Sequence, residues 1–85
     1  MDVQEAFTPV KLAANASYTL TNARMIGGFL ATATGTLKLV DPAGNEVVAA
    51  TAVTAGVFTP LPCKFAEPGA TITLASSAAG TLFIA

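Results

Sequence analysis

The chain contains no histidine and no tryptophan, and its single cysteine is Cys63. Without histidine, the sequence cannot supply a His-based catalytic triad, an imidazole general base or a histidine metal ligand. One cysteine cannot close a disulfide bond within its own chain, so we expect Cys63 to be reduced, partly buried and packed as a small apolar residue. These absences remove the commonest catalytic and metal-binding chemistries.

Charge is also scarce. Only 11% of the 85 residues are charged, and 53% are hydrophobic, whereas an ordinary soluble domain carries about 25% charged residues. A small domain has more surface per residue and should be richer in charge, not poorer. The four basic residues are scattered along the chain, so no basic cluster is present to bind nucleic acid. The composition predicts a protein that either covers much of its surface with other protein or lies in a membrane.

Uncharged segments long enough to cross a bilayer as a helix occupy residues 47–63 and 68–85. Both are interrupted by proline and glycine and alternate between apolar and polar residues, so we expect neither to form a membrane-spanning helix. The first residues read MDVQEAF, which is acidic where a signal peptide would be basic and apolar. We therefore expect synthesis in the cytoplasm and no membrane association.

Alternation with a period of two dominates the rest of the sequence. It runs through residues 17–21, 36–39 and 71–74, and it is typical of strands with one face in a core. Residues 24–31 form an apolar run of strand length in which the pair Gly27-Gly28 indicates a bulge or a close approach of backbones. No segment combines helical spacing with capping residues.

Turn residues separate these segments. Asp41-Pro42-Ala43-Gly44 favours a type I turn followed by a left-handed residue, which would join the flanking strands as a hairpin. Glu67-Pro68-Gly69 favours a type II turn, with glycine at the positive φ. Residues 76–80 predict a second hairpin, between strands at 71–75 and 81–85.

These patterns together predict an all-β fold. We expect a single domain over residues 7–85, a small antiparallel β-sandwich of about eight short strands, preceded by an N-terminal arm over residues 1–6.

A short phrase also occurs twice. Phe-Thr-Pro stands at residues 7–9 and again at 58–60, and each copy is followed later by a Gly-Thr-Leu strand. The echo suggests an internal duplication, although chance matches are common in a chain so rich in Thr, Gly, Ala and Leu. The outward residue of the Gly-Thr-Leu strand is Lys38 in the first half and Phe83 in the second. Phe83 is therefore either an exposed contact residue or a core residue folded over the end of the sandwich.

The sequence shows no group of residues arranged as in a catalytic site. The carboxylates lie near the N-terminus or in predicted turns, and no close pair looks buried. Asp41, Asn45 and Glu46 flank one turn and could chelate calcium, but turn formation explains these residues better. We expect no enzyme, no cofactor and no metal site.

Three segments carry a family resemblance: VTAGVFTPLPCKF, the closing AAGTLFIA, and FTPVKL followed by SYTL near the start. In these, the chain resembles the small head decoration, or cement, proteins of tailed bacteriophages. The resemblance covers most of the chain and lies in its short length, its Thr-, Ala- and Gly-rich alternating sequence and its lack of His and Trp. It implies a β-sandwich or β-tulip subunit, usually trimeric, on the outer surface of the virion capsid, where it clamps neighbouring capsid subunits.

The resemblance and the composition together predict a structural virion protein that binds the major capsid protein and associates with copies of itself, a homotrimer being favoured. Low net charge and repeated apolar contacts suit attachment in many copies. In this hypothesis the Phe-Thr-Pro segments bury against sister subunits and other loops contact the capsid. The candidate subunit or capsid contacts are Phe7, Pro9, Phe58, Pro60 and Phe83.

Two alternatives stay open. A receptor- or glycan-binding module of a head fibre or tail should display Trp or Tyr platforms, yet the only such residue is Tyr18, in a strand pattern. A membrane-active β protein would need strands of about 9–11 residues, and the strands expected here are nearer five or six.

Overall fold

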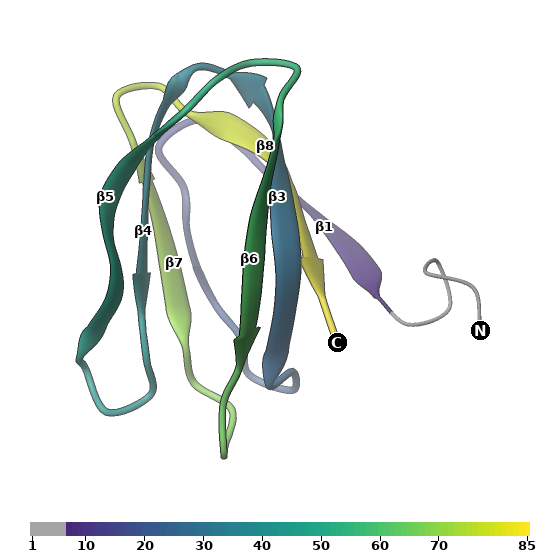
Figure 1. Cartoon of the computed structure of the whole chain (residues 1–85), viewed down its shortest axis with the longest axis vertical. Helices are drawn as coiled ribbons and strands as arrows, with labels where there is room; N and C mark the ends of the chain where they lie inside the picture. Colours follow the sequence, from purple (N-terminus) through teal and green to yellow (C-terminus); the bar gives the residue numbers. More distant parts are fainter. Residues whose placement is uncertain (1–6) are drawn as a thin grey trace.

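The computed structural model describes residues 7–85, which form eight β-strands and no helix (Figure 1). The strands are β1 (Thr8–Leu12), β2 (Ser17–Thr19), β3 (Met25–Ala33), β4 (Gly35–Val40), β5 (Glu46–Val53), β6 (Phe58–Lys64), β7 (Thr71–Ala75) and β8 (Ala79–Ile84). Within these residues there is no helix that is both long and apolar enough to span a bilayer. The predicted arm over residues 1–6 lies outside the described residues.

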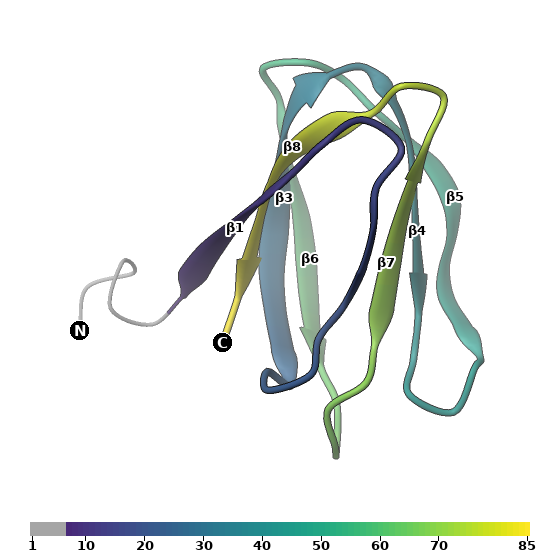
Figure 2. The same ribbon diagram turned by 180° about the vertical axis from the view of Figure 1, so that it is seen from behind.

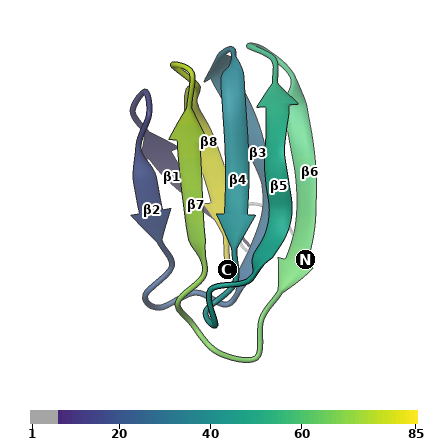
Figure 3. The same ribbon diagram turned by 90° about the vertical axis from the view of Figure 1, so that its left-hand side faces the viewer.

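The strands form two antiparallel sheets that pack face to face, so the predicted β-sandwich is confirmed. One sheet has the strand order β1-β8-β3-β6 and the other β2-β7-β4-β5. Figures 1 and 2 show the two layers from their edges, and Figure 3 shows the second sheet in front of the first. Consecutive strands in the first half of the chain alternate between the sheets, so most loops cross from one layer to the other.

The core lies between the layers and follows from the period-two alternation. In β7 and β8, every second residue is buried and those between are partly exposed. Phe29 of β3 is the largest fully buried side chain, with none of its surface exposed. Leucine, isoleucine and valine side chains from both sheets form the rest of the core with it. The fully buried members of this set are Leu20, Ile26, Leu37, Leu39, Ile72, Leu74, Leu82 and Val53.

The turn at residues 41–44 joins β4 to β5 as a hairpin, as predicted. The Asp41 N–H donates to the carbonyl oxygen of Asn45 at 2.8 Å, and Gly44 has a φ of +93°. The Asp41 carboxylate accepts the N–H groups of Ala43 at 3.0 Å and Asn45 at 2.8 Å. This carboxylate therefore closes a turn, and no group of three metal-ligating side chains occurs in the described part of the chain.

The predicted hairpin between residues 71–75 and 81–85 is wrong. The strands β7 and β8 are there, but they belong to different sheets and do not pair. The residues between them turn sharply, with positive φ at Ser76 and Ser77, and carry the chain across the core. The turn chemistry indicated a reversal of direction without indicating which sheet the next strand joins.

The strand order also argues against an internal duplication. The two Phe-Thr-Pro segments begin β1 and β6, which are opposite edges of one sheet. The two Gly-Thr-Leu segments lie in β4 and β8, which belong to different sheets. The two copies of the phrase therefore do not occupy equivalent places in the sandwich.

Candidate interaction face

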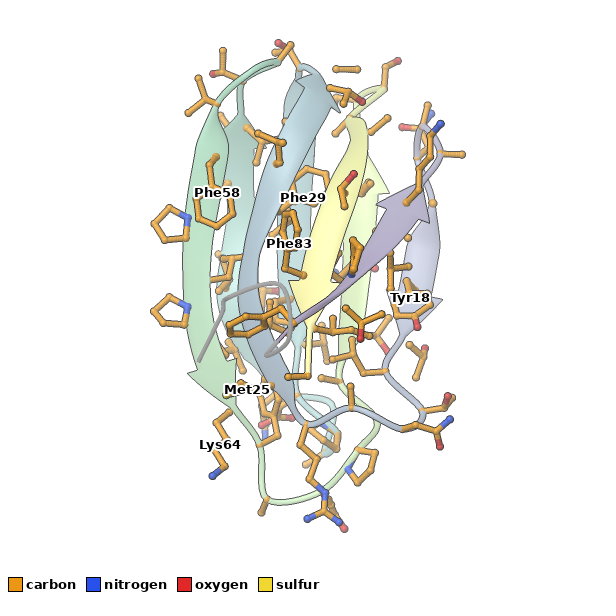
Figure 4. All side chains as sticks on the ribbon, turned by 90° about the vertical axis from the view of Figure 1, so that its right-hand side faces the viewer. Tyr18, Met25, Phe29, Phe58, Lys64 and Phe83 are labelled. Atoms are coloured by element: carbon orange, nitrogen blue, oxygen red, sulfur yellow. The ribbon has the colours of Figure 1, made fainter. Side chains whose placement is uncertain are left out.

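Aromatic and proline side chains gather on the outer side of the β1-β8-β3-β6 sheet (Figure 4). Phe83 of β8 lies between Leu82 and Ile84, which are buried in the core, so its side chain points outward. Directly opposite partners in neighbouring strands share a face, and the partners of Phe83 are Pro9 in β1 and Gly28 in β3.

The same reasoning extends to the β6 edge. Gly28 is opposite Pro60, and Leu30 is opposite Phe58. Pro62 follows Pro60 by two residues and shares its side of the strand. We call the outer surface formed by Phe7, Pro9, Leu30, Phe58, Pro60, Pro62 and Phe83 the aromatic-proline face.

All five residues predicted as contacts lie on this face. Pro9 and Pro60 come from its two edge strands, Phe83 and Phe58 from its middle and one edge, and Phe7 directly precedes β1. Phe83 is partly exposed on the outer side of the sheet, not folded into the core. These residues lie in three distant segments of the sequence, and the fold brings them together.

Two glycines in β3 shape the centre of the face. The pairing of β3 with both neighbours shifts between Ile26 and Gly28, so the predicted bulge is present. A Cβ atom on Gly27 would lie 2.8 Å from Cε1 of Phe7, and one on Gly28 would overlap the ring of Phe58. The close approach at these glycines is therefore made by aromatic rings resting on bare backbone, not by a second backbone.

The rings also contact one another. Phe58 and Phe83 have ring centroids 6.1 Å apart and planes tilted by 56°, within the range of favourable aromatic pairs. Phe58 nevertheless keeps 48% of its surface exposed, and Leu30 keeps 37%. A phenylalanine half-exposed in this way leaves a large apolar area in water.

A depression of about 500 Å³ opens on this face. Its walls include the rings of Phe7, Phe58 and Phe83, and Gly27 lies at its base. Lys64, at the end of β6, is the one charged residue lining it among residues 7–85. Figure 4 shows Met25 and Lys64 below Phe58 and Phe83.

Several residues of the face were missed from the sequence. Pro62 could have been found by continuing the period of two from Phe58 and Pro60. Leu30 had no such signal, because the glycine bulge before it breaks the alternation along β3. The sequence around Lys64 did not indicate that it lines a depression, because four separate segments form that depression.

Cys63 is a free, partly buried cysteine, as expected. It lies opposite Ile26, whose side chain is in the core, and packs against the core cluster. The single tyrosine, Tyr18, also packs partly against the core, and in Figure 4 it lies far from the phenylalanines.

Comparison with known proteins adds no relative to this geometry: no family model, no curated protein and no solved structure matches the chain.

Proposed function

We propose that this chain is a structural virion protein that binds the outside of a phage capsid as an oligomer, a trimer being favoured, and stabilises it. The observation that carries the proposal is the aromatic-proline face, with Phe58 half exposed and its ring held against Phe83 and Gly28. Covering a face of this kind with another protein removes apolar area from water and so lowers the free energy. The family resemblance of the sequence supplies the capsid as the expected partner.

The size of the face favours attachment in many copies. Four strands about 4.8 Å apart and roughly 20 Å long give a plan area of roughly 400 Å². Stable pairwise interfaces bury about 800 Å² on each partner, so one such face alone makes a weak contact. Linking several copies in an oligomer on a repeating shell raises the overall affinity without enlarging any single contact.

The sheet edges favour the same conclusion, because each is unsuited to pairing with another strand. In the first sheet, β1 carries Pro9 and β6 carries two prolines, which lack an N–H. In the second sheet, β2 has three residues. The pairing of β5 with β4 shifts register twice, and such bulges twist an edge strand away from a flat ladder. Association through a face is thus better supported than strand addition.

The proposal is tested by co-sedimentation of the purified chain with capsids that lack it. We expect saturable binding, and we expect the double variant Phe58→Ser/Phe83→Ser to bind roughly 30-fold more weakly or worse, as when central aromatic contacts are removed. The matched control is Thr19→Ala/Thr71→Ala, on the opposite sheet, which should bind as the wild type does. Thermal unfolding of each variant verifies that it is folded.

Two results would overturn the proposal. One is a wild-type chain that sediments as a monomer and shows no affinity for capsids. The other is a folded double variant that binds as tightly as the wild type.

A further inference from the structure

The depression in the aromatic-proline face has the size and lining of a binding site. At about 500 Å³, it falls within the range of roughly 300–1,000 Å³ typical of small-molecule pockets. Its aromatic walls contact the sheet and one another. The ring of Phe7 rests against Gly27, the ring of Phe58 rests against Gly28, and Phe83 contacts Phe58. These contacts lower the entropy cost of ordering the walls when a ligand binds.

Among residues 7–85, Lys64 on β6 is the charged residue that lines the depression. Lys11, opposite Thr81, is on the outward side of β1 at the other edge of the sheet and does not line it. No carboxylate of residues 7–85 lines the depression. An apolar group with a carboxylate beside it would complement this arrangement, because the ring walls accept the apolar part and Lys64 pairs with the charge.

A second copy of this chain is a poor occupant. None of the four strands that form the aromatic-proline face carries a carboxylate, so this face of a second copy would place no negative charge beside Lys64.

From these observations we infer that the depression is a socket for an apolar side chain of the partner protein, aromatic or aliphatic, that has a carboxylate next to it. The inference rests on the proposed function, since it names the chemistry of the surface that the aromatic-proline face contacts. It assigns that face to the partner, and sister copies then meet through other surfaces. This differs from the sequence-based hypothesis, in which the Phe-Thr-Pro segments bury against sister subunits.

The inference is tested with two probes that differ only in charge, N-acetyl-phenylalanine and N-acetyl-phenylalaninamide. Each is titrated into the isotope-labelled full chain and followed by the NMR shifts of its backbone amides. We expect both to shift Gly27, Gly28 and Lys64. We expect the carboxylate to bind up to about 5-fold more tightly at low salt, the upper range for an exposed ion pair, and the preference to disappear at 1 M salt.

Matched variants locate the charge. Lys64→Met should abolish the preference for the carboxylate and leave the affinity for the amide unchanged. Lys11→Met, on the far edge of the same face, should retain the preference. The inference is overturned if neither probe shifts Gly27 and Gly28, if the wild type shows no preference, or if Lys64→Met keeps it.

These outcomes are separable from those of capsid binding. If capsids bind through Phe58 and Phe83 but the probes fail, the socket is wrong and the proposed function stands. If the probes bind as expected but capsids do not, the socket stands and the capsid is not its partner.

Discussion

The two outer faces of the sandwich are built from strands of similar length but carry opposite chemistry. The outer side of the β2-β7-β4-β5 sheet, visible in Figure 3, carries the hydroxyl groups of Ser17, Thr19, Thr36, Thr71 and Thr73. We call it the hydroxyl face. Two cross-strand pairs join its residues, at 3.0 Å between Thr19 and Thr71 and at 3.5 Å between Ser17 and Thr73. The aromatic-proline face has rings and pyrrolidines at the corresponding outward positions.

The chain carries few charges, but the two outer faces replace them differently: one with uncharged polar groups and the other with apolar side chains. Hydroxyl groups remain hydrated without carrying charge, so the hydroxyl face is compatible with water. Phenylalanine and proline have no such groups, so covering the aromatic-proline face removes more apolar area from water than covering the hydroxyl face does. The protein is therefore one-sided, with one apolar outer layer and one polar outer layer.

The largest expected effect separates the inner and outer sides of the β1-β8-β3-β6 sheet. Phe29 is fully buried, whereas Phe83 is on the outer face of the adjacent strand. Phe29→Ala should lower the free energy of unfolding by about 3–5 kcal/mol. Phe83→Ala removes a half-covered ring and should cost about 1 kcal/mol. Urea unfolding followed by far-UV circular dichroism measures both.

If Phe29→Ala is unfolded in buffer, Phe29→Leu replaces it and should still cost more than Phe83→Ala. Equal losses at the two positions would mean that Phe83 belongs to the core, and the contrast between the two faces would lose its main element.

A smaller effect distinguishes Gly35, where an added side chain would meet backbone atoms, from Gly28, where it would meet the ring of Phe58. A Cβ on Gly35 would lie 2.5 Å from the carbonyl oxygen of Ala75 and 2.5 Å from the N atom of Ala78, which are backbone atoms. Gly35→Ala should therefore cost about 1–3 kcal/mol, as overpacking does. A Cβ on Gly28 meets the far end of the Phe58 side chain, which can swing away at little cost.

Gly28→Ala should thus change stability by less than about 1 kcal/mol, since alanine also restricts the unfolded chain. It should displace the Phe58 ring, which the NMR shifts of that ring report. If Gly28→Ala were as destabilising as Gly35→Ala, the Phe58 ring would be a fixed part of the fold and not an adjustable part of the face.

Much of the fold could be predicted because its signals are local. Alternation identified β7 as a strand with one buried side, the turn residues at 76–80 indicated a further strand at 81–85, and the Asp41 turn identified the β4–β5 hairpin. Which sheet a strand joins is not a local property. Both sheets present the same apolar inner surface, so nothing between Ser76 and Gly80 distinguishes a hairpin from a crossing to the other layer.

The face was predictable in composition but not in arrangement. Phe83 could be recognised as an outward residue from its own strand pattern, because its neighbours Leu82 and Ile84 are core residues. Phe58 could not, because neither Val57 nor Thr59 is buried. That Phe58 and Phe83 meet depends on β3, which pairs with both of their strands. The pair Gly27-Gly28 was the one local sign of this meeting, since side chains larger than hydrogen would occupy the space that the rings fill.

The smallest expected effect on stability is on the hydroxyl face. It tests whether the hydroxyl groups account for the difference between the two outer faces. Thr19→Val/Thr71→Val keeps the β-branched shape and removes the hydroxyl pair. Cross-strand pairs of this kind contribute about 0.2–1 kcal/mol, and valine suits a strand as well as threonine does. The free energy of unfolding should therefore change by less than about 0.5 kcal/mol.

The change in association should be larger than the change in stability, because the variant has two apolar outer faces where the wild type has one. Sedimentation velocity over a range of concentrations should show more self-association than in the matched variant Thr19→Ser/Thr71→Ser, which keeps both hydroxyl groups. If the valine variant associates no more than the serine variant, hydroxyl groups do not keep this layer free of protein contacts, and the one-sided character must come from the shape of the aromatic-proline face.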